Sequence, residues 1–250
     1  QEQKRKKAEE EVRRLNVELE DRVIQRTHQL NRQNAVLAAI NLVFQESMVC
    51  ESVADVGNVC LKVAEHLTES KLGFIGEVNQ NGRFDTMAMS NPGWEACKIP
   101  ETDAVRLINN MEIRGIWGRV IKDGRSLIVN EPASHPDRVG VPKDHPQLTS
   151  FIGIPLKQQG KTTGMISLAN KESGYSIDDQ QALESISIAF VEALNMQRAK
   201  EKILDINRNL EDANVELQVI NKELDLRKTE ADAANKAKSD FLANMSHELR

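Results

Sequence analysis

The chain has 250 residues, of which 28% are charged and only 4% are aromatic, and its formal net charge at pH 7 is −5. This length accommodates one or two domains, and the composition suits a globular domain combined with long, charged helices. The acidic balance, with no basic block apart from residues 4–7, disfavours a general nucleic-acid partner.

The cysteines and the lack of a long apolar run indicate the compartment. Cys50, Cys60 and Cys97 are odd in number and show no C-x-x-C spacing, so neither a disulfide framework nor a zinc cluster is expected. No uninterrupted apolar run approaches the roughly 18–20 residues that span a bilayer, and no signal peptide is visible. We therefore expect a cytoplasmic chain, with a membrane anchor upstream in a longer parent protein as an open alternative.

Residues 1–47 carry the pattern of one long helix. Their apolar positions step by threes and fours, which is the spacing of one helix face. They are Val12, Leu15, Leu19, Val23, Leu30, Leu37, Ile40 and Phe44, with Arg26 and Gln33 in the same stripe. The length of the stripe favours a coiled coil between two chains, of modest strength because of its polar positions. The alternative is an amphipathic helix docked on its own domain. The stretch E-L-E-D-R-V-I-Q-R-T-H-Q-L resembles the connector helices of sensor kinases.

Between residues 48 and 197 the pattern alternates between helical and extended. We expect helices at 51–70, 102–110 and 115–124, and strands at 72–79, 83–90, 126–130, 150–157 and 162–171. Asn81-Gly82 is a hairpin signal between the first two strands, and Gly124 is placed to end a short helix. Asp178 is expected to cap a last helix that begins near Asp179 and has no obvious stop before the C-terminus.

Three stretches of this region resemble a GAF domain, a module that binds ligands or dimerises. They are G-R-V-I-K-D-G-R-S-L-I-V-N at 118–130, S-F-I-G-I-P-L at 150–156 and G-M-I-S-L-A-N-K at 164–171. The resemblance implies an α+β fold, in which an antiparallel sheet with helices on one side lies between long N- and C-terminal coiled-coil helices. Asn170-Lys171 with Tyr175 and Asp178-Asp179 also resemble a motif of cyclic-nucleotide GAF domains, for which a surface salt bridge from loop to helix is the alternative explanation.

Residues 131–148 contain four prolines and no periodicity. A loop of that length in a compact domain is usually functional. In GAF domains the ligand pocket lies between the sheet and the loops above it. The resemblance therefore implies a small-molecule pocket lined by Trp94, Cys97, Trp117, His135 and His145.

The second half of this loop resembles a haem-binding group within the GAF family. Residues 137–151 are similar to the corresponding loop in the GAF domains of mycobacterial dormancy sensor kinases. The proximal haem ligand of that group falls on His145, and its distal tyrosine falls on Ser167. The alternative, which we favour, is that His145 and His135 fix the loop through hydrogen bonds to backbone carbonyls. Apart from a haem iron, no metal site is expected.

Residues 198–236 carry a heptad repeat. The seam consists of Ile203, Leu210, Leu217 and Leu224 at strict sevens, with Ile206, Ala213, Ile220 and Arg227 between them. This pattern predicts a parallel two-stranded coiled coil and therefore a homodimer. Ala213 and Arg227 weaken the seam, which suits a coil with two packings of similar energy.

The C-terminal stretch carries a candidate catalytic histidine. Leu242, Met245 and Leu249 share one helix face, and His247 points about 200° away from Met245 and Leu249. Glu248 can hold one ring nitrogen protonated while the other attacks a group from outside. The string F-L-A-N-M-S-H-E-L-R closely resembles the H-box of sensor histidine kinases, which implies that His247 is the phospho-acceptor and that Glu248 assists as acid or base.

These patterns divide the chain into four parts: a signalling helix at 1–47, a GAF sensor domain at 48–197, a coiled-coil linker helix at 198–236 and the start of a phospho-acceptor helix at 237–250. We expect the sensory input and dimerisation segment of a two-component histidine kinase. No phosphate-binding glycine loop is present, so ATP would be used by a catalytic domain outside this chain, and the phosphoryl group would pass to the receiver domain of a response regulator. Two rivals stay open, a haem or other small-molecule binding module and a ligand-free dimerisation spacer.

Overall fold

The computed structural model describes residues 2–90, 109–140 and 146–248. Within these ranges the side chains at 4, 8, 9, 243 and 246–248 are not described. The chain divides into two compact units, Gln1–Arg198 and Ala199–Arg250, and the division falls inside the last helix. Most of the helix predicted at 102–110 lies outside the described residues.

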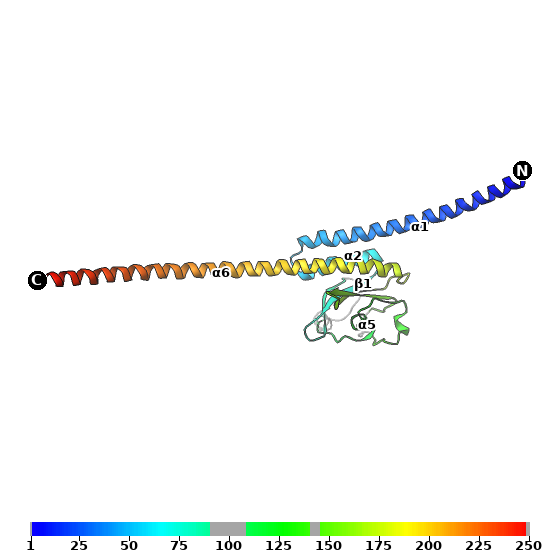
Figure 1. Ribbon diagram of the computed structural model, residues 1–250. Coiled ribbons are helices and arrows are strands. Elements are labelled where there is room, and N and C mark those ends of the chain that lie inside the picture. The colour runs from blue at the N-terminus through cyan, green and yellow to red at the C-terminus, as the bar shows by residue number, and fades with distance from the viewer. Residues whose placement is uncertain (1, 91–108, 141–145, 249–250) are drawn as a thin grey trace. The chain divides into compact units, whose positions relative to one another are not determined.

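The helices follow the predicted pattern closely (Figure 1). They are α1 (Glu2–Val49), α2 (Val53–Thr68), α5 (Gly115–Asp123), α6 (Ile177–Glu248) and the short 3-10 helix η1 (Pro132–Ser134). A capping box begins α2, since the Asp55 amide donates to the Ser52 hydroxyl at 3.2 Å and the Ser52 amide donates to the Asp55 carboxylate at 3.0 Å. The short helix α5 ends at Gly124, whose φ of +60° is the left-handed conformation that glycine adopts readily.

The strands form one antiparallel sheet, so the α+β fold class is confirmed. The strands are β1 (Leu72–Val78), β2 (Phe84–Met89), β3 (Leu127–Val129), β4 (Phe151–Gln158) and β5 (Lys161–Ala169), in the order β2-β1-β5-β4-β3. The β1–β2 hairpin turns through Gly82 at φ +71°, as the Asn-Gly signal predicts.

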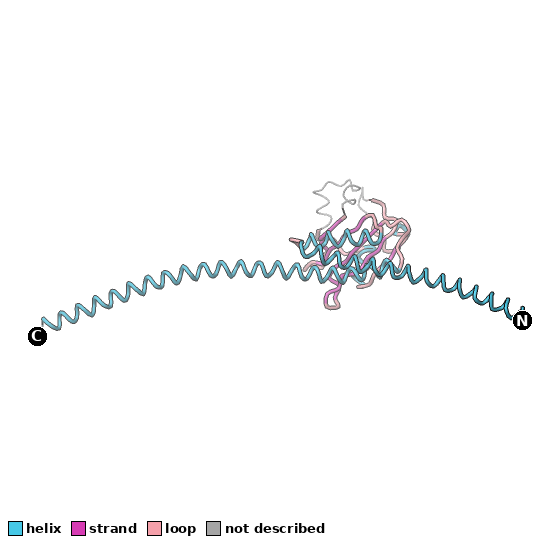
Figure 2. Tube along the Cα trace, turned by 90° about the horizontal axis from the view of Figure 1, so that it is seen from above, coloured by secondary structure: helices cyan, strands magenta, loops and turns pink. Residues whose placement is uncertain are grey.

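The sheet has two apolar faces, because successive side chains of a strand point to opposite sides. On β4, Ile152 and Ile154 join a buried cluster with residues of α1, α2 and α6, which overlie this face (Figure 2). Phe151 joins a second cluster on the opposite face with Val120 of α5. The expectation of helices on one side is therefore corrected: the three longer helices cover one face, and the short α5 covers part of the other.

The docked face of α1 differs from the predicted stripe. Ala39 and Val43 are buried in the core, and Phe44 packs against it, whereas Leu30 and Leu37 remain exposed. The end of α1 is thus docked on its own domain, which was the alternative interpretation of this helix. The described side chains before residue 32 are all exposed, and the coiled coil expected for this part of α1 stays a prediction.

The first turn of α6 corrects the predicted cap. The Asp179 amide donates to the Ser176 hydroxyl at 3.2 Å, and the Ser176 amide donates to the Asp179 carboxylate at 2.9 Å. This is a capping box with Ser176 at the N-cap and Asp179 three positions later. Asp178 therefore lies inside the helix and is not its cap.

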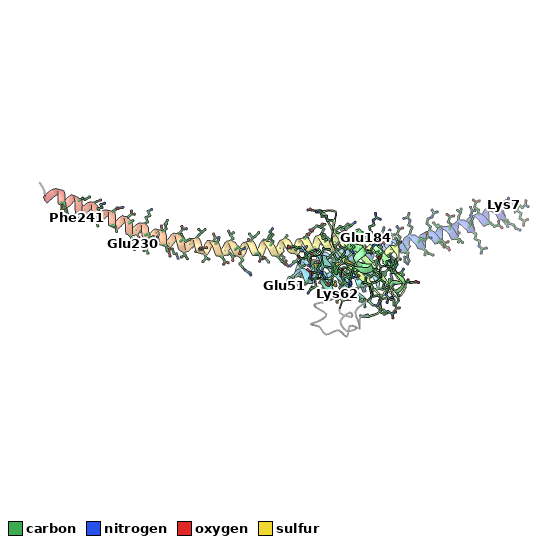
Figure 3. The ribbon with its side chains drawn as sticks, turned by 90° about the horizontal axis from the view of Figure 1, so that it is seen from below. Lys7, Glu51, Lys62, Glu184, Glu230 and Phe241 are labelled. Atoms are coloured by element: carbon green, nitrogen blue, oxygen red, sulfur yellow. The ribbon has the colours of Figure 1, made fainter. Side chains whose placement is uncertain are left out.

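The unit Ala199–Arg250 is helical through Glu248. Its described side chains are exposed beyond Glu201, including Phe241, which is labelled in Figure 3. Among the residues that the structure describes, no helix combines the length and apolar character needed to cross a membrane.

Candidate functional site

Trp117 lies in an aromatic cluster on the α5 face of the sheet. Its ring centroid is 5.3 Å from that of Phe84 and 6.4 Å from that of Phe74, and the contact with Phe74 is edge-on. Phe74 and Phe84 also meet edge-on at 5.9 Å. Each such pair contributes about 0.5–1.5 kcal/mol beyond the area that it buries. Trp117 is therefore part of the core of this face, and its role as a ligand contact stays a prediction.

Two buried side-chain oxygens lack a hydrogen-bond partner within the described part of the chain, Thr86 Oγ1 and Glu65 Oε1. Thr86 pairs in the ladder with Gly76, where an added Cβ would meet the Phe84 ring, so Thr86 lies on the aromatic face. Burial raises the pKa of Glu65, although a hydrogen bond from Ser90 and the charge of Lys62 oppose that rise. A buried polar atom without a hydrogen-bond partner lowers the stability of the fold by about 1–3 kcal/mol. A ligand or proton that paired with either oxygen would recover part of that free energy.

His135 holds the start of the 131–148 loop. Its Nδ1 accepts a hydrogen bond from the Asp137 amide at 3.1 Å, which places the proton of the neutral ring on Nε2. The Asp137 carboxylate lies 3.5 Å from Arg119 of α5, so loop and helix are tied together. The contact is to a backbone N–H, whereas the sequence suggested backbone carbonyls.

The other predicted pocket residues are not all described. Trp94, Cys97 and His145 lie outside the described residues, so their roles as ligand contacts, including haem ligation by His145, stay predictions. Ser167 is buried on β5, directly opposite Phe74 in the ladder. No cluster of three or more metal-ligating side chains is found among the described residues.

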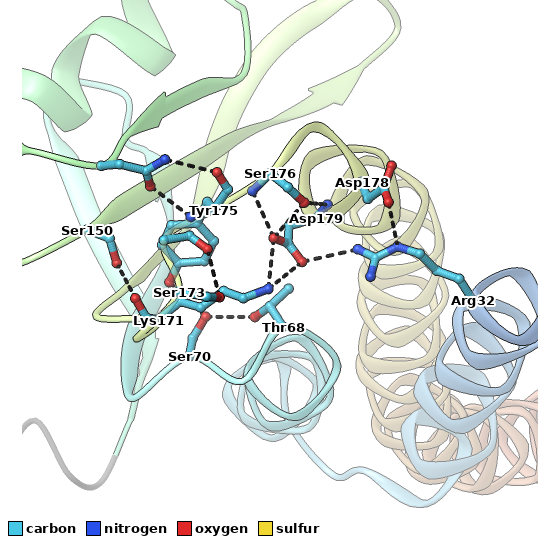
Figure 4. A network of polar contacts seen from close by, with 12 residues as sticks. Arg32, Thr68, Ser70, Ser150, Lys171, Ser173, Tyr175, Ser176, Asp178 and Asp179 are labelled. Carbon is cyan, nitrogen blue, oxygen red and sulfur yellow. Dashed lines mark hydrogen bonds and ion pairs between the residues drawn. The ribbon is translucent and has the colours of Figure 1, made fainter. Parts of the chain in front are cut away.

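A buried charge network lies where α1 and the start of α6 meet on the domain (Figure 4). The Asp179 side chain is 1% exposed, and its carboxylate accepts from Lys171 Nζ at 2.9 Å and from Arg32 Nη2 of α1 at 3.1 Å. Burial alone would raise the pKa of Asp179, but hydrogen bonds from Lys171, Ser176 and Arg32 outweigh it and hold the pKa below its usual value. The salt bridge suggested for this motif is therefore present, but it is largely buried, with Lys171 15% and Asp179 1% exposed.

The network continues into α2 and β3. The Tyr175 hydroxyl lies 2.7 Å from the Ser70 hydroxyl, which lies 2.7 Å from that of Thr68 at the end of α2. Asn130, just after β3, accepts from the Tyr175 amide at 2.7 Å and donates to its carbonyl at 3.0 Å. Burial raises the pKa of Tyr175, so the phenol stays protonated.

Sequence reasoning missed Arg32 as a member of this site. The signal was a cation four residues before Val36 and eleven before Val43, on a helix face beside the predicted stripe. Val36 and Ile40 are half-buried and Val43 is buried. A single arginine in line with docked apolar residues indicates an acidic partner on the surface beneath them.

The predicted phospho-acceptor lies on α6. The helical backbone includes positions 247 and 248, whose side chains lie outside those described. Phe241, Leu242 and Met245, which precede them, are exposed. The roles of His247 and Glu248 stay predictions.

The heptad positions of the second unit form an exposed apolar stripe. Its exposed large side chains are Ile203, Ile206, Leu210, Leu217, Ile220 and Leu224. Repetition at sevens puts them on one side of the helix. This is the surface on which the predicted dimer depends.

Comparison with known proteins identifies the domain. A family model described as GAF domain matches residues 50–195. A methyl sulfide methyltransferase-associated sensor of Methanosarcina acetivorans is 26% identical over 182 residues, 72% of this chain and 18% of that protein. The sensor protein GacS of Pseudomonas syringae is 47% identical over 109 residues, 42% of this chain and 12% of that protein. The chain thus spans less than a fifth of the length of either relative.

Solved structures agree on the fold. The GAF domain of a phosphoenolpyruvate-protein phosphotransferase from Coxiella burnetii superposes with a TM-score of 0.57 at 16% identity, covering 69% of this chain and 99% of that one. A free methionine-R-sulfoxide reductase from Neisseria meningitidis gives a TM-score of 0.53 at 13% identity, covering 66% and 91%. Because the family model covers more than half of its residues, the chain belongs to the GAF domain family.

Proposed function

We propose that this chain is the sensory input and dimerisation segment of a two-component sensor histidine kinase. The observation that carries the proposal is α6, a single helix of 72 residues that begins at the charge network of the GAF domain and includes positions 247 and 248. Similarity to two sensor proteins, one of them at 47% identity, supports the same context. A continuous helix can carry a rotation or shift of its first turn toward a phospho-acceptor.

In this function His247 accepts the γ-phosphoryl group of ATP that a catalytic domain holds. An unprotonated ring nitrogen forms the N–P bond, the P–O bond to ADP breaks, and Glu248 holds the proton on the other ring nitrogen. The phosphoryl group then passes to an aspartate on a receiver domain. The chain's own contribution is to present the histidine on a helix and to bias its position from the GAF domain.

The same function requires two copies of the chain. The exposed heptad stripe from Ile203 to Leu224 supports a parallel homodimer. In a single helix this apolar face stays in water and adds no stability, whereas in a coiled coil it is buried. In a dimer the two α6 helices move against each other, so a change at either domain reaches both phospho-acceptors.

The assignment is tested in a protein that restores the second hairpin helix and a catalytic domain. With labelled ATP we expect acid-labile label in the wild type and none in His247→Gln. His66→Gln is the matched control, because His66 is exposed on α2, and it should keep the label. Undiminished label in His247→Gln contradicts the proposal.

Binding of a small molecule on the α5 face is the second candidate, and it is favoured by the hydroxyl of Thr86, which has no hydrogen-bond partner among the described residues. A ligand with a hydrogen-bonding group would satisfy that oxygen beside the aromatic rings. In a ligand-free chain Thr86→Val, which keeps the shape, should stabilise the domain by about 1 kcal/mol because it removes an unpaired polar atom. A loss of stability would show that the hydroxyl is already paired, and the basis for this candidate would be gone.

A further inference from the structure

Arg32 is the outermost contact of α1 with the domain. In chain order it is the first residue of α1 that is partly covered, with 34% of its side chain exposed, and the described side chains before it are all exposed. Apolar docking follows from Val36 onward. If the exposed part of α1 before residue 32 rotates or shifts, the Arg32 guanidinium is therefore the first group whose contacts with the domain change.

That guanidinium pairs with two carboxylates of the first turn of α6. Its Nη2 donates to Asp179 at 3.1 Å, and its Nε lies 3.9 Å from Asp178. Asp179 also closes the capping box with Ser176. The Asp179 carboxylate thus both binds Arg32 of α1 and caps the first turn of α6 (Figure 4).

Lys171 brings a second input to the same carboxylate. Its Nζ lies 2.9 Å from both Asp179 oxygens, and its side chain is only 15% exposed. Its carbonyl accepts from the Ser150 hydroxyl at 3.0 Å. Oδ1 of Asp179 is shared by the two cations, so the position of one affects the other.

Lys171 is in turn bound to the end of the 131–148 loop. The neighbouring Asn170, at φ +64°, donates to the Gln147 carbonyl at 2.9 Å and accepts from the Thr149 amide at 2.9 Å. Gln147, Thr149 and Ser150, which we call the loop end, are thereby joined to the segment that carries Lys171. A displacement of the loop end must move Lys171 or break these bonds.

We propose that Asp179 is a coupling point at which two inputs, the upstream helix through Arg32 and the loop end through Lys171, act on the first turn of α6. The two inputs are linked, so that a change at one alters the hold on the other. The linkage is reciprocal, because coupling between two sites is the same free energy read from either side. A signal carried along α1 then reaches the first turn of α6 through Arg32 and Asp179.

The test is amide hydrogen exchange on the intact chain, comparing Arg32→Gln with Arg26→Gln. The control arginine lies on the same helix, and its side chain contacts Gln29 of that helix. We expect Arg32→Gln to speed exchange about fivefold in residues 32–40 and also at the loop end and residues 170–174, which are joined to Arg32 through Asp179. Arg26→Gln should change neither segment, and Arg32→Lys, which keeps the charge, should restore part of the protection.

The reciprocal variant is Ser150→Ala, a mild change that removes the bond from the loop end to the Lys171 carbonyl. It should speed exchange in residues 32–40 of α1. If Arg32→Gln affects α1 only, or Ser150→Ala leaves α1 unchanged, the two inputs are independent and the proposal is wrong. The coupling at Asp179 deepens the proposed function and rests on it for the role of α6 as a relay. The two are tested separately, because amide exchange does not involve His247 and phosphorylation of His247 does not report on exchange in α1.

Discussion

The helix α6 has a first part, residues 177–198, and a second part, residues 199–248. Both carry apolar residues at helical spacing, but among the described residues only those of the first part are covered by other elements. Leu183, Ile186 and Phe190 are 0% exposed against the sheet and its helices. Ile203, Leu217 and Leu224 are 58%, 56% and 63% exposed. Because most helical stability in proteins comes from packing an apolar face, the covering that stabilises the first part is the role that the proposed dimer would play for the second part.

The largest expected effect on stability comes from removing a buried side chain of the first part of α6. Phe190→Ala removes a fully buried ring and should lower the free energy of unfolding of the domain by about 3–5 kcal/mol. Guanidinium titration followed by tryptophan fluorescence measures the loss. Phe241→Ala is the matched control, since Phe241 is exposed on the second part, and it should stay within about 0.5 kcal/mol. Equal losses would remove the distinction between the two parts.

The charge at the start of α6 should give the next largest effect. Asp179→Asn leaves the largely buried Lys171 ammonium without its carboxylate and should cost about 3 kcal/mol at pH 7. The folded pKa of Asp179 lies below the usual value of about 3.9, so its contribution is full above that pH and is lost as the pH falls through the folded pKa.

Unfolding free energies of wild type and Asp179→Asn, measured down the acid range, should therefore converge below about pH 4. The exposed neighbour provides the control, because Asp178→Asn should run parallel to the wild type throughout. A gap between wild type and Asp179→Asn that keeps its full size at about pH 3 would mean that the carboxylate charge is not what stabilises this turn.

The role of the exposed second part of α6 is tested by measuring the dimerisation of the chain. Leu217→Lys places a charge in the predicted seam and should weaken dimerisation at least about tenfold, or about 1.4 kcal/mol, in sedimentation velocity. Val215→Lys changes an equally exposed apolar residue at an outer heptad position and should leave association as it is. If both variants associate like the wild type, the seam is not the dimer surface.

Features that depend on near neighbours in the chain could be predicted from the sequence. Asn81-Gly82 and Gly124 determine a turn and a helix end through backbone conformation alone, and the alternation along β4 places Phe151 and Ile152 on opposite faces. These signals need no knowledge of the rest of the fold. The GAF architecture followed because several of them occur in the right order.

Features that depend on distant residues could not be predicted. Arg32 and Asp179 are separated by 147 positions, and no local pattern relates them. The cap of α6 was assigned to Asp178 because aspartate and serine are both good N-caps, and only the position of the helix start favours Ser176. For the candidate site, Trp117 was recognised, but its packing on Phe74 and Phe84 joins three separate elements.

The smallest effect comes from repairing the weakest apolar position of the seam. Ala213 stands between Leu210 and Leu217 and offers one methyl group where the neighbouring positions offer large side chains. Ala213→Leu should fill that gap and strengthen association about fivefold, or about 1 kcal/mol, in sedimentation equilibrium. Val215→Leu raises helix propensity at an outer position and should not, so a gain shared by both variants would trace to helix formation instead of packing. A gain in Ala213→Leu alone would mean that the seam is kept below its full strength, which leaves the two helices free to shift against each other when the first turn of α6 moves.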